Sequence, residues 1–230
     1  MAKQSADEIV EELMGSHFAE TQVDLPSGKT VRLTPITFEV EKQMVSRTDA
    51  EGDTVDFILE KCVKDADLDE LMEIDANYIL FKIREISYGP EYKFIQPCPA
   101  CGSEQHFSVN VGELPVKRLE DDGEVEMVLP MSGMEVVLRR ATRADRKHLE
   151  NGEIMMDSIW RFVKSFGGYD RKDVISKVIP RLTAGDLDTL IKVVTASDYG
   201  LQTTIRMKCN QCGHDAPMAL PLTQGFFSVS

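Results

Sequence analysis

Two short cysteine motifs constrain this chain more than any other feature of its sequence. The first reads CPACG and occupies residues 98–102, and the second reads CNQCG and occupies residues 209–213. One CxxC pair is ambiguous among a redox pair, half of a metal site and chance. Two copies, each followed by glycine, favour a single site with four thiolates, which is the ligand set of a structural zinc ion.

The residues around the two motifs repeat at a constant spacing. Counted from Ser87 in SYG and Asp198 in DYG, each residue of the first copy matches the one 111 positions later, so Cys98 falls on Cys209. Phe94, before the first motif, falls on Ile205. Alternating apolar residues continue after each motif and predict a strand there. These residues are Phe107, Val109 and Val111 in the first copy and Met218, Leu220 and Leu222 in the second. Each CxxCG is therefore expected in a turn between two strands, the setting of a zinc knuckle.

Earlier segments extend the repeat. LPSGKTVRLTPIT, from Leu25, and LPMSGMEVVLRRAT, from Leu129, both alternate apolar residues around a Ser-Gly turn. This pattern predicts a β-hairpin in each half. DLDEL (67–71) matches DLDTL (186–190), and each is expected to open a helix. On this alignment the second helix is eight residues shorter than the first, or about two turns.

Helical periodicity fills the segment between the hairpin and the DLD motif of each half. TVDFILEKCV has one apolar face, formed by Val55, Ile58, Leu59 and Cys62. EIMMDSIWRFVKSF has another, formed by Met156, Ile159, Trp160 and Val163. Both are predicted to be helices. Cys62, the fifth cysteine, is therefore expected in the core.

The sequence thus predicts an internally duplicated α+β fold. Each half contains a β-hairpin, helices and a zinc-knuckle ribbon, and the two knuckles form one zinc site with four cysteine ligands. The expected boundaries are an N-terminal helix in residues 1–22, a first half in 23–118 and a second half in 119–230. Ser5 and Glu8 have the spacing of a capping box, which predicts a helix from residue 6 to about residue 20.

We expect Cys98, Cys101, Cys209 and Cys212 to bind one structural zinc ion. A redox CxxC would open a helix in a βαβ unit, whereas strands are expected on both sides of these motifs. Four thiolates complete a tetrahedral shell and leave no open position for catalysis. Iron in the same shell stays an alternative. His214, directly after the second motif, is a less favoured replacement ligand.

The charge of the chain limits its partners. Its 230 residues carry a formal net charge of −13, which disfavours generic binding to nucleic acid. A local exception is LRRATRADRKH, which contains Arg139, Arg140, Arg143, Arg146 and Lys147. We expect these cations on a solvated strand end and helix face. Docking to an acidic protein neighbour and binding to nucleic acid are the alternatives, in that order.

Several classes of protein are disfavoured by what the sequence lacks. It has no run of about 18 apolar residues, so no membrane span is expected. The start MAKQSADEIVEELMGSHFAE has one lysine followed by acids, unlike a secretory signal, so we expect a cytosolic chain with reduced thiols. We find no Gly-rich phosphate loop, GxSxG motif or paired-carboxylate signature. We therefore expect no enzymatic activity, no catalytic residue and no small-molecule substrate.

With these motifs assembled, the chain resembles the baseplate hub protein family of T-even-type contractile-tailed bacteriophages, as a zinc-knuckle-containing member. The resemblance covers roughly residues 23–227. It rests on DLPSGKTVRLTPIT, LFKIREISYGPEYKF, CPACG, FSVNVGELPV, VLPMSGMEVVLRRAT and CNQCGHDAPMALPLTQGFF. It implies a protein of virion morphogenesis without turnover chemistry, either at the centre of the tail baseplate or assisting assembly of the hub.

Three functions remain open at this point. The first is a structural component of a phage baseplate hub, and the second is a non-virion assembly factor for the same baseplate. The third, from another class, is a zinc-ribbon regulator of nucleic acid or of the transcription machinery. For the first two, the expected partners are other phage tail and baseplate proteins. The expected location is the host cytoplasm during assembly, and the virion tail baseplate if the protein is retained.

The C-terminal segment GFFSVS has two consecutive aromatic residues, Phe226 and Phe227. In an extended chain, neighbouring side chains point to opposite faces. We therefore expect one ring to pack under the second ribbon and the other to face outward, towards a partner subunit.

Overall fold

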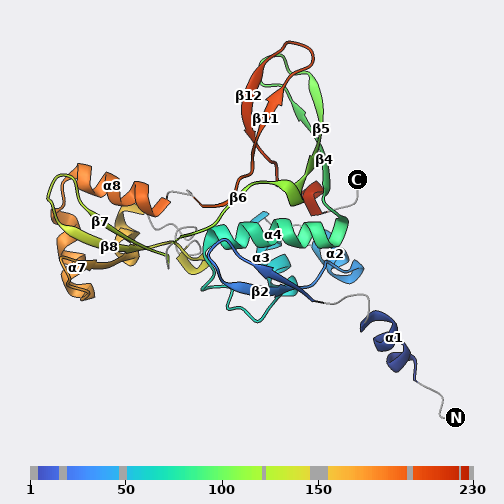
Figure 1. Cartoon of the computed structure of the whole chain (residues 1–230), viewed down its shortest axis with the longest axis horizontal. Helices are drawn as coiled ribbons and strands as arrows, with labels where there is room; N and C mark the ends of the chain where they lie inside the picture. Colours follow the sequence, from blue (N-terminus) through green and yellow to red (C-terminus); the bar gives the residue numbers. More distant parts are fainter. Residues whose placement is uncertain are drawn as a thin grey trace.

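The structure is a computed structural model that describes residues 5–15, 20–46, 51–120, 123–145, 155–195, 199–222 and 224–227. Within these residues the fold is α+β, as the sequence predicts, with small antiparallel sheets and helices. Figure 1 shows a central first lobe, a second lobe at one end of the long axis, and an arm of β-ribbons that stands on the first lobe.

The first lobe is built on a three-stranded antiparallel sheet in the order β1-β2-β3, with helices packed against it. Its elements are β1 (Thr21–Asp24), β2 (Thr30–Leu33), α2 (Phe38–Val45), α3 (Glu51–Cys62), β3 (Val63–Lys64) and α4 (Glu73–Tyr88). Val31 and Leu33 alternate with exposed residues along β2 and are buried. Cys62 is also buried in this core, as predicted.

The second lobe has a similar order of elements, and its sheet has the order β7-β8-β9. Its elements are β7 (Glu124–Val128), β8 (Glu135–Arg139), α6 (Met155–Ser158), the 3-10 helix η2 (Ile159–Phe162), β9 (Val163–Phe166), α7 (Lys172–Val178), the 3-10 helix η3 (Ile179–Arg181) and α8 (Ala184–Thr195). The two predicted hairpins are therefore present, as β1-β2 and β7-β8.

The third strand of each sheet was not expected from the sequence. The helix predicted for residues 153–166 is wrong in its second half, because the chain leaves the helix after η2 and forms β9. There Val163 pairs with Leu138 of β8 and is buried, as is Phe166. Pairing with an open strand edge and burial of these side chains outweigh the helical periodicity.

The two DLD motifs are not equivalent in the fold. DLDEL (67–71) lies in turns before α4, whereas DLDTL (186–190) lies inside α8. The prediction that both open a helix is therefore wrong for the first motif. The backbone of this motif instead contacts the segment after β8. The carbonyl oxygen of Asp69 accepts a hydrogen bond from the N–H of Ala144, and that of Leu71 accepts one from the N–H of Arg143. The first residues of α4 and α8 have the same offset as the two cysteine motifs, so α8 is not shortened at its start.

Two hydrophobic cores organise the described residues. The second lobe has a core of its own, which is drawn from residues 129–194. The core of the first lobe also takes side chains from the end of the chain, namely Leu220, Phe226 and Phe227. The first lobe is therefore completed by residues that follow the second lobe in sequence.

Both C-terminal rings enter the first core, so the prediction that one of them faces outward is wrong. Residues 224–227 form the 3-10 helix η4 (Gln224–Phe227) and not an extended tail. Neighbouring side chains in this helix therefore do not point to opposite faces, as they would in a strand. The Phe226 ring lies edge-on against Phe81 and Tyr92, at centroid distances of 4.8 and 4.9 Å. The carbonyl oxygen of Phe227 accepts a hydrogen bond from the hydroxyl of Tyr88.

The N-terminal helix α1 (Ala6–Gly15) has the predicted capping box. The N–H of Glu8 donates to the hydroxyl of Ser5, and the N–H of Ser5 donates to the carboxylate of Glu8. Glu20 lies outside this helix, and residues 16–19 are not among the described residues. In Figure 1, α1 projects away from the first lobe.

Candidate metal centre

The arm consists of two antiparallel ribbons, residues 91–110 and 204–219. Their strands are β4 (Glu91–Pro97) with β5 (Glu104–Asn110), and β11 (Thr204–Lys208) with β12 (Asp215–Ala219). Each CxxCG motif lies in the turn of one ribbon, as predicted. The strand registers are also equivalent. Phe94 pairs with Phe107, and the residues 111 positions later, Ile205 and Met218, pair in the same way.

Short connectors join the ribbons to the lobes. The first ribbon continues into the 3-10 helix η1 (Val111–Glu113) and then β6 (Val116–Lys117). β6 pairs antiparallel with β10 (Gly200–Leu201), which precedes the second ribbon. This two-stranded pairing brings together the bases of ribbons that lie far apart in sequence.

The four motif cysteines come together at the tip of the arm. Their sulfur atoms all lie within 4.8 Å of one another. Across the two ribbons, Cys98 Sγ lies 3.7 Å from Cys212 Sγ, and Cys101 Sγ lies 3.7 Å from Cys209 Sγ. Cys98 and Cys209 are buried, whereas Cys101 and Cys212 are exposed. His214 is not part of this cluster.

Both motif turns have the same backbone conformation. In the first, the N–H of Gly102 donates to the carbonyl of Cys98 at 2.8 Å, and the N–H of Gly213 donates to that of Cys209 at 3.0 Å in the second. The two glycines have φ angles of 73° and 74°, in the left-handed region that side chains with a Cβ rarely adopt. The glycine after each second cysteine therefore permits the turn that points both sulfurs to one side.

Two polar side chains that the sequence did not single out connect the knuckles. The hydroxyl of Ser103 lies 3.1 Å from Cys101 Sγ and 3.4 Å from Cys209 Sγ. The amide of Gln105 donates to the Ser103 hydroxyl and accepts from the N–H of Asn210. The constant spacing contained no signal for these residues, because the positions 111 residues later hold His214 and Ala216.

The environment of the sulfurs separates their proton affinities. The Ser103 hydroxyl, with the backbone N–H groups of Cys212 and Gln211, lowers the pKa of Cys209 to about 5. A hydrogen bond from the backbone of His214 acts to lower the pKa of Cys212. Loss of hydration and three neighbouring sulfurs outweigh it and raise this pKa to about 12. The Ser103 hydroxyl also lowers the pKa of Cys101. Cys209 therefore forms a thiolate readily near neutral pH, whereas Cys212 resists ionisation unless a cation compensates the charge.

This geometry fits a tetrahedral metal ion. Zn–S bonds of about 2.3 Å place the sulfurs of a regular tetrahedron about 3.8 Å apart. The two cross-ribbon distances of 3.7 Å agree with that edge length and are far too long for disulfides. Four cysteines would fill the shell of such an ion, which suits a structural role in joining the ribbons.

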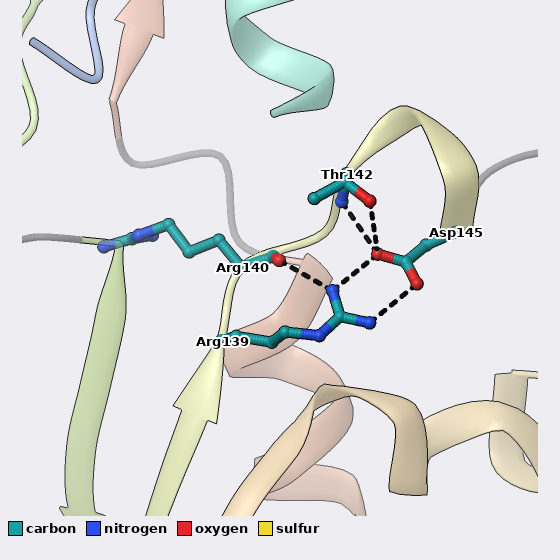
Figure 2. A network of polar contacts seen from close by, with 4 residues as sticks. All are labelled: Arg139, Arg140, Thr142 and Asp145. Carbon is teal, nitrogen blue, oxygen red and sulfur yellow. Dashed lines mark hydrogen bonds and ion pairs between the residues drawn. The ribbon is translucent and has the colours of Figure 1, made fainter. Parts of the chain in front are cut away.

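The basic segment after β8 turns inward. Arg139 forms two hydrogen bonds to the carboxylate of Asp145, at 2.6 and 2.8 Å, and Thr142 donates to the same carboxylate (Figure 2). Burial alone would raise the pKa of Asp145, but these contacts lower it. Arg143 is buried and pairs with Asp56 of the first lobe.

Arg140 lies over the ring of Tyr199, at 4.6 Å from its centroid. The expectation of a solvated basic face is therefore wrong for these arginines, which bind groups within the chain. Arg146 and Lys147 lie outside the described residues.

Comparisons with known proteins give one match. A family model described as T4 bacteriophage base plate protein matches residues 18–228, which include both lobes and the arm. No curated protein and no solved structure matches the chain. Among the described residues, every helix is too short or too polar to cross a membrane.

Proposed function

Because the chain belongs to the T4 bacteriophage base plate protein family, we propose that it acts in the hub of a contractile-tailed phage baseplate. It serves there as a structural or assembly component that binds other tail proteins. One zinc ion on Cys98, Cys101, Cys209 and Cys212 joins the two ribbons into a rigid arm. The family match supports the baseplate role. The observation that supports the metal centre is the convergence of four sulfurs from two distant motifs within 4.8 Å of one another.

The proposal includes an internal duplication, with an N-terminal segment in residues 1–22 that contains α1, and halves in 23–118 and 119–230. Its support is the constant offset between the copies, which relates the motif turns, the ribbon registers and the first residues of α4 and α8. The sheets β1-β2-β3 and β7-β8-β9 also have the same strand order. In this interpretation the zinc ion joins two copies of one ancestral ribbon.

Metal analysis of the purified full-length protein tests the centre. We expect one zinc ion per chain, and its loss in the Cys209→Ser variant. Cys62→Ala is the matched control, because Cys62 is buried in the first core and should not affect the metal content. Iron in place of zinc would change the identity of the ion but keep the four ligands. Full metal content in Cys209→Ser would contradict the site.

Deletion of this chain from a phage that encodes it tests the function. We expect that its removal prevents assembly of baseplates, and that Cys209→Ser reproduces the defect at least in part. Mass spectrometry of purified particles then separates the two roles, since a structural component is retained and an assembly factor is absent. Normal baseplates in the absence of the chain would contradict both roles.

A further inference from the structure

The second lobe carries a basic surface that contrasts with the rest of the chain. Residues 161–181 contain six basic and two acidic side chains, within a protein whose net charge is −13. The basic residues are Arg161, Lys164, Arg171, Lys172, Lys177 and Arg181. Lys164, Lys172 and Lys177 are exposed, and they lie on β9 and α7. Such a local excess of one charge favours a ligand of the opposite charge.

A groove of about 370 Å³ lies on this surface, between β8, η2, β9 and α7. It is lined by Arg139, Trp160, Arg161, Val163, Lys164, Asp170, Lys172 and Ile175. The guanidinium of Arg161 lies over the Trp160 ring, at 5.0 Å from its centroid. At the rim, Arg139 pairs with Asp145 and Lys164 pairs with Glu124. Arg161 and Lys172 add positive charge beside Asp170, so the groove combines apolar walls with a rim of net positive charge. A purely electrostatic ligand such as a nucleic acid backbone would not use those apolar walls, and the acidic remainder of the chain would repel it.

Helix α1 has the complementary chemistry. Its ten residues contain four acidic side chains and no basic one. Ile9, Val10 and Met14 lie on one side of the helix and are 42%, 56% and 46% exposed. An acidic amphipathic helix whose apolar side faces solvent is suited to a groove with apolar walls and a basic rim.

We propose that α1 of one copy docks into this basic groove on the second lobe of another copy. Ile9 and Val10 enter the groove beside Trp160, and Glu8 faces the rim near Lys172. This proposal goes beyond the hub function and does not depend on the metal, because neither the helix nor the groove belongs to the arm.

The positions of the two elements favour a contact between copies over one within a chain. In Figure 1, α1 and α7 lie at opposite ends of the molecule, with the first lobe between them. The segment from residue 16 to residue 20, which joins α1 to β1, can extend by no more than about 18 Å. A contact between two different surfaces is heterologous, so it generates a closed ring or an open chain of copies.

Tryptophan fluorescence tests the contact directly, since Trp160 is the only tryptophan in the chain. A synthetic peptide of residues 1–20 is titrated into dilute full-length protein at low salt. We expect a saturable change in emission, and a loss of affinity of at least about tenfold in Lys172→Glu. Lys177→Glu, on the same helix but outside the groove, should change the affinity by no more than about twofold.

Two peptides separate a specific fit from charge attraction. A peptide with Ile9→Asn and Val10→Asn keeps the charge and should lose binding. A peptide with Glu8→Lys should regain affinity for Lys172→Glu. The proposal is overturned if the emission does not change, if the Asn peptide binds as well as the natural one, or if Lys177→Glu weakens binding as much as Lys172→Glu.

Full-length variants test the assembly by sedimentation velocity. Lys172→Glu has an intact helix, and Ile9→Asn/Val10→Asn has an intact groove. Each alone should stay monomeric at concentrations where the natural chain associates, while an equal mixture should form a 1:1 pair. Association of either variant alone, or no pair in the mixture, would show that α1 and the groove do not meet.

Discussion

The two hairpin turns are each bound by a buried aspartate, but the two carboxylates are not equally well satisfied. Under the first turn, Asp75 of α4 accepts the N–H of Ser27 at 3.1 Å, and its second oxygen has no hydrogen-bond partner among the described residues. Under the second turn, Asp186 of α8 accepts the N–H groups of Met131 and Ser132, at 2.8 and 3.1 Å. The two aspartates occupy matching positions, because their offset is that of the cysteine motifs.

The same position therefore has opposite electrostatics in the two lobes. Burial raises the pKa of Asp75 despite its contacts with Ser27. Burial acts in the same direction on Asp186, but the hydrogen bonds from the second turn outweigh it and lower the pKa. The second lobe thus satisfies its carboxylate within residues 123–195 and has its own core. In the first lobe, only one oxygen of the turn aspartate accepts a hydrogen bond, and the core depends on side chains from the C-terminal segment.

Removal of the proposed zinc ion should give the largest difference between the lobes. Structural zinc contributes apparent binding free energies of about 10–16 kcal/mol, comparable to the net stability of a domain. Because η4 and Leu220 follow the second ribbon, chelation should expose the arm and loosen the first core while the second lobe keeps its protection. Hydrogen exchange of the full-length protein with and without chelator measures this. Equal loss of protection in residues 123–195 would mean that the lobes are not independent.

Truncation of one core ring in each lobe tests whether the two cores unfold independently, and its expected effect is the second largest. Phe226→Ala should cost about 3–5 kcal/mol, because the ring is fully buried against Phe81 and Tyr92. Phe162→Ala is the matched change in the second core, where the ring is also fully buried. Hydrogen exchange should locate the first loss in the first lobe and arm, and the second loss in residues 123–195. If both changes destabilise the whole molecule, the two cores unfold as one unit.

Much of this arrangement follows from local sequence signals. The Ser-Gly hairpin turns, the CxxCG knuckles and the apolar face of α3 are each specified by residues close together in the chain. The convergence of the four cysteines also follows, because each knuckle supplies two ligands and a tetrahedral ion needs four. These features depend on spacing and residue type, which a single sequence contains.

The features that sequence reasoning missed depend on tertiary contacts. β9 forms because β8 presents an open edge. Phe226 is buried against Tyr92, and Phe227 is buried against Phe226. The similarity of DLDEL to DLDTL aligns the wrong residues. The spacing of the cysteine motifs instead relates Asp75 to Asp186, and this spacing agrees with the first residues of α4 and α8. Ser103 and Gln105 connect the knuckles through contacts that only the paired ribbons create.

Replacement of each turn aspartate by asparagine tests the comparison directly. Asp186→Asn should destabilise the second lobe, because the amide presents an N–H group to one of two backbone donors. Asp75→Asn should change the stability by less than about 1 kcal/mol, because only one oxygen accepts a bond and a buried charge is removed. Urea unfolding of both variants measures the difference. A larger loss in Asp75→Asn would reverse our ranking of the two turns.

The pH dependence of the same two carboxylates gives the smallest effect and the clearest signs. The pKa of Asp186 is lowered in the folded state, so its stabilisation is present above the unfolded value of about 3.9 and is lost as pH falls through the folded pKa. The pKa of Asp75 is raised, so the folded state takes up a proton more readily than the unfolded state. The cost of its buried charge is therefore relieved as pH falls from neutral towards about 4.

Each Asn variant should be compared with the natural chain at every pH. Acid also protonates the proposed metal ligands in both proteins, and the comparison cancels this common effect. Between neutral pH and about pH 4, the natural chain should gain stability relative to Asp75→Asn. Below about pH 4 it should lose its advantage over Asp186→Asn. Stability differences that do not vary with pH in either comparison would contradict the assignment of opposite proton affinities to the two turns.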